Sequence, residues 1–209
     1  MVGRAILLAA LVALAACGHK PSGPGDVTQE RLLAAGKDAD NWLGYGRTFE
    51  EQRFSPLTDV NDANAAKLGL AWAVELDTHR GQEATPIVVD GVMYFSTAWS
   101  KVYAVDAASG KVLWKYDPKN IGAKAVHACC DVVNRGVAVW KGKVFVGTID
   151  GRLIALDAAT GKVVWSVLTI DQKQPYTITG APRVFKDKVI IGNSGAEFGV
   201  RGYITAYDT

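Results

Sequence analysis

Hydrophobic and polar residues alternate in short runs along most of the chain, a pattern that predicts half-buried β-strands rather than helices. From residue 86 to residue 116 it predicts four strands, at Pro86–Val89, Val92–Ser96, Lys101–Asp106 and Lys111–Tyr116. Asp90-Gly91, between the first two, is a strong signal for a two-residue hairpin turn. We therefore expect an antiparallel four-stranded sheet in this region.

The same succession of strands recurs further along the chain. A second set of four is expected at Gly136–Trp140, Lys143–Gly147, Arg152–Asp157 and Lys162–Leu168. Four antiparallel strands at a period near 50 residues are typical of a β-propeller blade. Solenoid repeats of that period would need helical spacing, which this pattern lacks.

A turn motif repeats with the strands. The segment AVDAASGKVLW, which ends at Trp114, returns 51 residues later as ALDAATGKVVW, which ends at Trp165. A third copy starts with Ala206-Tyr207-Asp208-Thr209. The Asp and Ser/Thr side chains can close the turn on the backbone, and the glycine can adopt a positive φ. We expect the tryptophan to lie on the outer strand and to pack against the next blade.

Composition narrows the function classes. The chain has 209 residues, 49% of them hydrophobic, which is enough for one packed core or two. The 23 basic and 21 acidic residues nearly balance and form no Lys/Arg cluster, so we expect no nucleic-acid partner.

The first residues predict a targeting segment. Arg4 precedes an apolar run, Ala5–Ala16, that is too short to span a bilayer as a helix. The run ends in Leu14-Ala15-Ala16-Cys17, which resembles the lipobox of bacterial lipoproteins. That resemblance implies a signal peptide over residues 1–17, lipidation of Cys17, and a periplasmic protein that the lipid could hold to the outer membrane. Ordinary cleavage after Ala16, leaving a free thiol, is the alternative.

Residues 18–40 predict a linker and a short helix. The linker is rich in Pro and Gly, and Thr28 can cap a helix whose apolar side carries Leu32 and Leu33 and which Gly36 can end. Residues 41–209 then form the strand-rich domain.

With Cys17 used in processing, Cys129 and Cys130 remain as a pair. Two readings are open: two reduced neighbours, or a disulfide between adjacent residues, which an oxidising compartment favours. Such a bridge closes a strained ring and removes almost no chain entropy, so a role in a site is the better explanation for it than stability.

Two segments resemble a known family. The repeated A-x-D-x-x-[ST]-G-x-x-x-W turn resembles the tryptophan-docking motif of quinoprotein propellers. Cys129-Cys130-Asp131-Val132-Val133-Asn134-Arg135-Gly136 closely resembles the segment of quinoprotein alcohol dehydrogenases in which the vicinal disulfide lies flat against pyrroloquinoline quinone (PQQ). The resemblance covers residues 41–209 and implies an all-β fold, a partial β-propeller of about three blades from a propeller of about eight.

The resemblance also implies site residues. Arg135 would pair with a carboxylate of the cofactor, and Glu83 would lie at the cofactor edge. The loop between Gly192 and Gly202 is six residues longer than its counterparts in the two preceding repeats, and such insertions are commonly functional. Within it Glu197 matches the family's calcium-binding glutamate. The remaining matches to cofactor-lining positions are Thr179, Ser194, Gly195 and Ala196.

The function implied is oxidation of a small alcohol with PQQ and Ca2+. Electrons would pass to a haem or to a periplasmic acceptor such as a cytochrome c. No C-x-x-C-H occurs in the sequence, which leaves a fused haem c domain open. The family's aspartate general base, its asparagine calcium ligand and its quinone-covering tryptophan have no counterpart here. We therefore assign no catalytic residue and expect a fragment that is inactive alone.

Two rival functions fit parts of the sequence. A non-catalytic propeller lipoprotein, such as a scaffold for outer-membrane β-barrel assembly, would explain the lipobox and the docking motif but leaves Cys129-Cys130 and Arg135 without a role. A quinoprotein sugar dehydrogenase is the other, and the vicinal cysteines favour the alcohol branch. We expect two upstream segments, Asn41–Arg47 and Gln52–Leu57, to close the propeller by pairing with its last blade.

Overall fold

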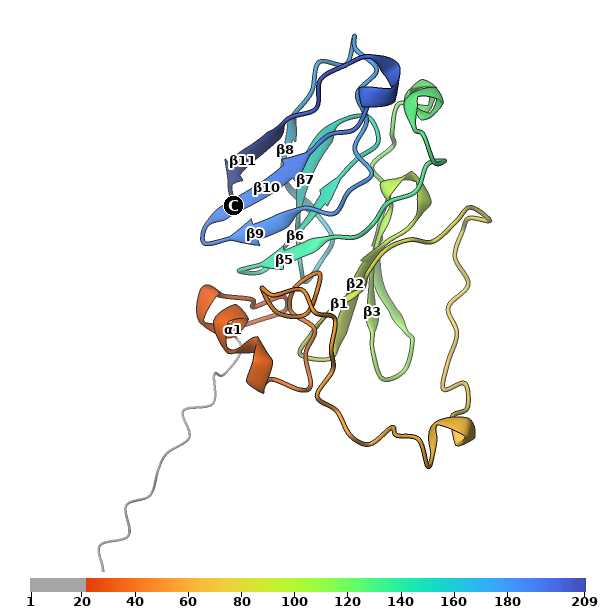
Figure 1. The fold of residues 1–209 in the computed structure, drawn as a ribbon, viewed down its shortest axis with the longest axis vertical. Helices are drawn as coiled ribbons and strands as arrows, with labels where there is room; N and C mark the ends of the chain where they lie inside the picture. Colours follow the sequence, from red (N-terminus) through yellow and green to blue (C-terminus); the bar gives the residue numbers. More distant parts are fainter. Residues whose placement is uncertain (1–21) are drawn as a thin grey trace, which may run out of the picture.

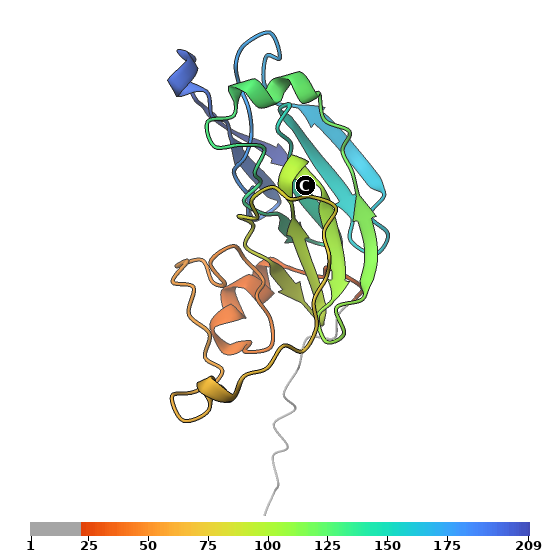
Figure 2. The same cartoon turned by 90° about the vertical axis from the view of Figure 1, so that its right-hand side faces the viewer.

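In the computed structural model, residues 22–209 are described and form three antiparallel sheets beside an N-terminal layer (Figures 1 and 2). The predicted signal peptide and Cys17 lie outside these residues. None of the helices within residues 22–209 has the length and apolarity needed to cross a bilayer.

Each sheet follows the chain order from its inner to its outer strand. The first sheet contains β1 (Ile87–Val89), β2 (Val92–Ser96), β3 (Val102–Asp106) and β4 (Val112–Tyr116). The second contains β5 (Ala138–Trp140), β6 (Lys143–Gly147), β7 (Arg152–Asp157) and β8 (Val163–Leu168). The third contains β9 (Arg183–Phe185), β10 (Lys188–Gly192) and β11 (Ile204–Asp208).

The strands of the first two sheets lie within two residues of the positions that the sequence pattern predicts, and the all-β, partial-propeller fold is confirmed. The pairing register of the strands also repeats from sheet to sheet. The second strand of each sheet begins with Val92, Lys143 or Lys188, and this residue pairs with the motif aspartate at the end of the third strand of the same sheet.

The middle strands form the core because each sheet packs face to face against its neighbour. Val102, Ala104, Leu153 and Ala155, on β3 and β7, are completely buried. The outer strands β4 and β8 alternate between exposed and half-buried positions, since one face meets solvent.

The first of the two repeated tryptophans, Trp114, joins its sheet to the next, as predicted. The indole Nε1 of Trp114, on β4, donates to the carbonyl of Ala158 at 2.9 Å, and the ring covers Gly161 in the β7–β8 turn. Trp72 makes the same contacts one sheet earlier. Its Nε1 donates to the carbonyl of Ala107 at 3.1 Å, and its ring covers Gly110. Trp72 thus occupies the position of an outer-strand tryptophan from a preceding blade.

The N-terminal layer packs across the inner strands. Helix α1 (Gln29–Ala34) begins at Thr28, whose hydroxyl accepts from the backbone N–H of Arg31 at 3.3 Å. Leu32 of the helix is buried, but Leu33, which was predicted to lie on the same apolar side of the helix, is 70% exposed. A short 3₁₀ turn, η1 (Ala35–Lys37), continues past the predicted end of the helix.

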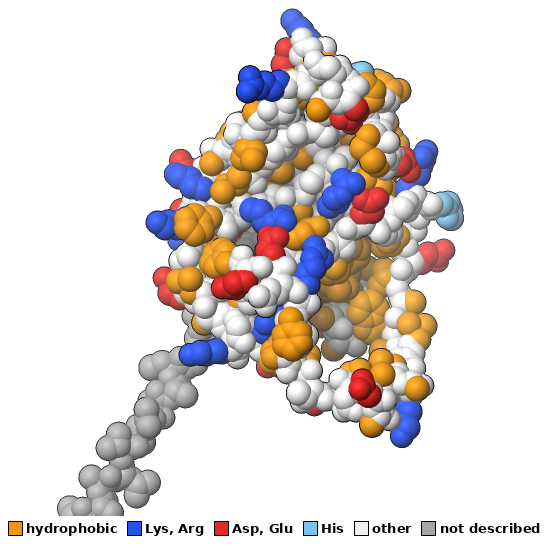
Figure 3. All heavy atoms as spheres, viewed as in Figure 1, with side chains coloured by type: hydrophobic (Ala, Val, Ile, Leu, Met, Phe, Trp, Pro, Cys, Tyr) orange, Lys and Arg blue, Asp and Glu red, His pale blue; other side chains and the backbone are white. Residues whose placement is uncertain are grey.

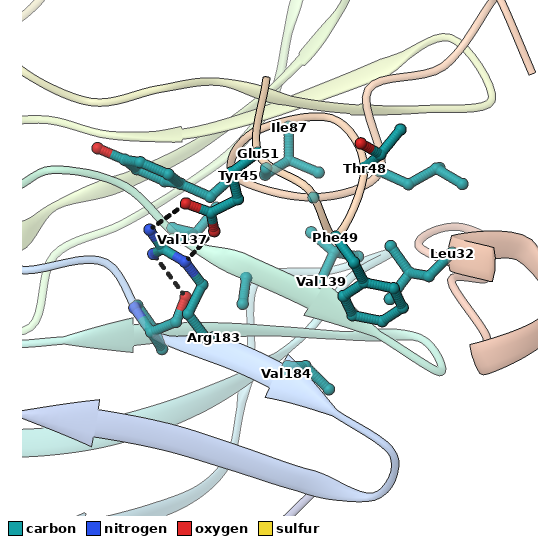
Figure 4. A pocket seen from close by; sticks show the side chains of 14 residues that line it. Leu32, Tyr45, Thr48, Phe49, Glu51, Ile87, Val137, Val139, Arg183 and Val184 are labelled. Carbon is teal, nitrogen blue, oxygen red and sulfur yellow. Dashed lines mark hydrogen bonds and ion pairs between the residues drawn. The ribbon is translucent and has the colours of Figure 1, made fainter. Parts of the chain in front are cut away.

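A small cavity of about 50 Å³ lies between this layer and β1, β5 and β9, and Figure 4 shows its lining. Arg183 of β9 crosses it to bind Glu51 at 2.7 Å and stacks over the ring of Tyr45 at 3.8 Å. Trp42 pairs its backbone with Val88 of the first sheet. The Asn41–Arg47 segment therefore pairs with the first blade, and its expected pairing with the last blade of the propeller stays a prediction.

Residues 52–70 arc away from the sheets, and from Trp72 onward the chain contacts the first sheet again before it reaches β1 (Figure 1). The arc carries a short turn, η2 (Ala65–Lys67), and a hollow opens between it and the body (Figure 3). It exposes the large hydrophobic residues Phe54, Leu57, Val60, Leu68 and Leu70. Beyond the arc, Asp77 binds Lys101, Lys115 and Tyr103 of the first sheet. The hydrogen bonds from Lys101 and Lys115 lower the pKa of Asp77.

Candidate functional site

The chain enters the three sheets in the same way, and this entry places the candidate site. Glu83, Asn134 and Thr179 each stand four residues before the first residue of β1, β5 and β9 respectively. The three entering segments are hydrogen-bonded to one another through their backbones. Thr85 N–H donates to Arg135 O at 3.2 Å, and Arg135 N–H donates to Thr179 O at 2.9 Å. Residues distant in sequence thereby meet at one end of the inner strands.

Arg135 is the centre of this meeting point. Its Nη2 lies 3.0 Å from Oε2 of Glu83, and its Nη1 donates to Oγ1 of Thr179 at 2.7 Å. The Arg135 and Glu83 side chains are 36% and 39% exposed, so the pair is open to a ligand. The structure therefore brings together three residues that the sequence resemblance selects from three separate blades.

A hollow of about 250 Å³ opens beside Arg135. Its lining comprises Arg135, Thr179, Gly180, Ala181, Ile191, Gly192, Asn193 and Ser194. Asn193 Oδ1 is buried and has no hydrogen-bond partner among residues 22–209. A cationic fork and the hydroxyl-bearing residues Thr179 and Ser194 thus line one space, which suits a ligand with several polar groups.

The cysteine pair lies in the loop before β5. Cys129 and Cys130 form a disulfide, with their Cα atoms 3.8 Å apart, and both residues are exposed. Arg80, from the loop that carries Glu83, binds Asp131 at 2.8 Å. The hydrogen bond from Val132 and the ion pair with Arg80 lower the pKa of Asp131. The disulfide loop is therefore tied to the Glu83 loop.

Two short turns, η3 (Ala98–Ser100) and η4 (Gly122–His127), lie before the disulfide in the chain. The carbonyl of His127, at the end of η4, accepts from Oγ1 of Thr177 at 3.5 Å. Thr177 in turn is hydrogen-bonded to Ser194, with 2.7 Å between their hydroxyl oxygens. The disulfide loop thus also adjoins the loop that follows β10.

Near its start, the inserted loop contains Ser194 and Gly195. Gly195 has φ +126°, and a Cβ there would lie 2.6 Å from the carbonyl oxygen of Pro175, so only glycine fits. The turn η5 (Ala196–Phe198) follows, and the ring of Phe198 meets His127 edge-on at 5.5 Å. His127 therefore packs at the edge of the site.

Ala196 and Glu197 are exposed. No hydrogen bond or ion pair joins Glu197 to any other residue in the described part of the chain. Residues 22–209 contain no group of three or more His, Cys, Asp or Glu side chains that could hold a metal. Glu197 is thus a single carboxylate, separate from the Arg135 cluster.

Two residues of this region were not selected from the sequence. Asn134 shares its register position with Glu83 and Thr179, and the repeat itself could have revealed it. Asn193 borders Ser194, but nothing in its spacing marks it as part of the site.

The family model "Glucose/ethanol/alcohol dehydrogenase, beta-propeller domain" matches residues 42–209. The chain belongs to this family. The family resemblance inferred from the repeated turn and the cysteine pair is therefore confirmed.

Three similar proteins place the chain within this dehydrogenase family. The structure of quinohemoprotein alcohol dehydrogenase ADHIIG from Pseudomonas putida HK5 superposes with a TM-score of 0.87 and 61% identity, covering 88% of this chain and 27% of that one. The 1-butanol dehydrogenase (cytochrome c) of Thauera butanivorans is 62% identical over 168 residues, 80% of this chain and 24% of that protein.

A europium-containing methanol dehydrogenase superposes with a TM-score of 0.81 and 42% identity, covering 86% of this chain and 32% of that one. The chain thus spans about a quarter to a third of the length of these relatives. They are dehydrogenases, so the non-catalytic scaffold is not favoured.

Proposed function

We propose that this chain forms the cofactor-binding part of a PQQ-dependent alcohol dehydrogenase. The observation that carries the proposal is the guanidinium of Arg135, held between Glu83 and Thr179 at the edge of a polar hollow. The names of the similar proteins, a quinohemoprotein alcohol dehydrogenase and a 1-butanol dehydrogenase, support the same class of reaction.

The residues around the hollow fit a planar polyanion. PQQ carries three carboxylates, and a guanidinium fork is suited to bind one of them in bidentate fashion. The hydroxyls of Thr179 and Ser194 would meet the cofactor's other polar groups. The exposed disulfide Cys129–Cys130 would offer a flat, polarisable surface to the ring. When bound, the quinone supplies the acceptor for hydride from the alcohol.

We infer that Glu197 contributes one ligand to a Ca2+ ion or a similar hard cation. A carboxylate on an exposed, glycine-rich loop has the ligand chemistry that such ions prefer. The europium named for the similar methanol dehydrogenase supports a hard cation in this family. Because residues 22–209 hold no carboxylate cluster, further ligands would have to come from elsewhere.

The substrate, acceptor and location complete the proposal. A small primary alcohol and a cytochrome c fit the name of the similar 1-butanol dehydrogenase (cytochrome c). The apolar run before Cys17 supports export to the periplasm, with lipidation of Cys17 as a membrane anchor. Within the chain, Arg135 and its partners bind and orient the cofactor, and we assign no proton-transfer residue.

Quinone binding tests this proposal directly. PQQ is titrated, with Ca2+ present, into the polypeptide that the gene encodes and, separately, into the 209-residue chain. Equilibrium dialysis measures the bound quinone, and dye reduction measures turnover. We expect the encoded polypeptide to bind PQQ and the 209-residue chain to show no quinone-dependent dye reduction. Failure of the encoded polypeptide to bind PQQ would refute the function, and robust turnover by the 209-residue chain would refute its assignment as a partial site.

A further inference from the structure

Asn134 shares a register position with two cofactor-site residues but has a different environment. Glu83 and Thr179, at the same position before β1 and β9, extend their side chains to the Arg135 guanidinium. Asn134, at that position before β5, is only 1% exposed. In the second blade the next residue, Arg135, lies at the centre of the site. The Asn134 side chain therefore makes none of the contacts that Glu83 and Thr179 make with Arg135.

The carboxamide of Asn134 joins the first two sheets. Its Nδ2 donates to the carbonyl of Gly147, the last residue of β6, at 2.8 Å. Its Oδ1 accepts from Oγ of Ser96, the last residue of β2, at 2.6 Å. Ser96 and Gly147 are equivalent positions in adjacent blades, so one buried side chain fixes the relative placement of two matching strand ends.

The same oxygen also accepts from the N–H of Gly136 at 3.1 Å, so Asn134 fixes the backbone on both sides of Arg135. Gly136 has φ +136°, and a Cβ there would lie 3.1 Å from the carbonyl oxygen of Thr85, so the inner strands approach closely at this point. Together with the backbone bonds of Arg135 to Thr85 and Thr179, these contacts hold the Arg135 Cα at one place between three blades.

We propose that Asn134 is a positioning residue that sets the affinity of the site for PQQ by holding Arg135 between Glu83 and Thr179. This inference rests on the proposed function. Without the carboxamide, three buried groups lose their partner, on Ser96, Gly136 and Gly147, and the backbone beneath the guanidinium is released. A guanidinium fork keeps its bidentate geometry only when its attachment point is fixed.

A double-mutant cycle tests this coupling in the polypeptide that the gene encodes. PQQ affinity is measured by quenching of tryptophan fluorescence, with Ca2+ present, for Asn134→Ala, Arg135→Ala and the double variant. We expect Asn134→Ala to weaken binding about tenfold, and to add little once Arg135 is absent, because it acts through Arg135.

Tyr94→Phe is the matched control, since it removes another buried bond between the same two sheets, from Tyr94 Oη to Ala158 O at 3.3 Å. It should lower thermal stability and leave PQQ affinity unchanged. If Asn134→Ala does not fold, Ser96→Ala removes one of the three bonds and should give a smaller loss with the same dependence on Arg135.

The outcomes separate the two proposals. Unchanged PQQ affinity in Asn134→Ala, or a loss that adds fully to that of Arg135→Ala, overturns the positioning role while leaving the function intact. Absence of PQQ binding by the unsubstituted polypeptide overturns the function and the positioning role with it.

Discussion

The indole ring of Trp114 lies directly over Gly161, and a methyl group added to that glycine would meet the ring at 2.6 Å. Gly161 also has φ +69°, so it combines a left-handed backbone with a close ring contact. The contact joins the outer strand of the first sheet to a turn of the second, and it explains why glycine and tryptophan recur together in the repeat.

Gly161→Ala should therefore destabilise the chain by about 2–4 kcal/mol, from the left-handed backbone and the displaced ring together. Gly91→Ala is the matched control, because Gly91 has φ +80° but nothing within 4 Å of the added methyl group. It should cost only about 1 kcal/mol. Urea unfolding followed by tryptophan fluorescence measures both, and equal losses would contradict the docking contact.

Arg135→Lys should weaken PQQ binding by about tenfold or more, although the positive charge remains. A lysine ammonium cannot bind a carboxylate through two parallel N–H bonds while also reaching Glu83 and Thr179. Arg183→Lys, which alters a guanidinium in the N-terminal layer, is the control. Equilibrium dialysis with PQQ measures the affinity, and an equal effect of both substitutions would count against the assigned site.

Replacing both Cys129 and Cys130 with serine should reduce PQQ affinity and leave stability nearly unchanged. The bridge joins residues one apart, so it restricts the unfolded chain very little. We expect the thermal midpoint to move by less than about 4 °C. Mass spectrometry of the parent chain should show a mass lower than that of the reduced form by two hydrogen atoms. A large fall in the midpoint with unchanged affinity would give the bridge a stabilising role instead.

Asp150 makes stability depend on acid pH. Burial raises the pKa of this carboxyl, but bonds from Arg152 at 2.8 Å, Thr148 at 2.5 Å and the backbone of Ile121 at 3.1 Å outweigh it and lower the pKa. In the relevant pH range the unfolded state therefore binds more protons. The stabilisation is complete above the unfolded pKa of about 4 and is lost as pH falls through the lower, folded value.

Asp150→Asn should accordingly be less stable than the parent chain at pH 7, with the difference shrinking as pH falls below about 4. Urea unfolding over this pH range measures the difference. The exposed Asp62→Asn serves as the control and should match the parent throughout. A deficit of Asp150→Asn that stays constant down to pH 3 would disprove the role of the ionised carboxyl.

The strands, the turns and the blade period could be predicted because local chemistry specifies them. Asp90-Gly91 and the repeated Asp-x-x-Ser/Thr-Gly turns favour one backbone path whatever surrounds them. The pairing of Trp42 with Val88 could not be predicted from the sequence. Backbone pairing depends on how the segments pack, and no residue type marks which segments will pair. Trp72 lacks the repeated turn around it, so its docking on Gly110 became visible only in three dimensions.

The sequence by itself determined the family, the three-sheet repeat and the choice of Glu83, Arg135 and Thr179 as candidates, since these depend on motifs and spacing. Only the tertiary structure decided that Arg135 bridges the other two, that Asn134 supports it from a buried position, and that Glu197 is separate from this cluster. The reason is that the period sets which residues share a register, whereas side-chain direction, burial and contact between blades depend on how the sheets pack together.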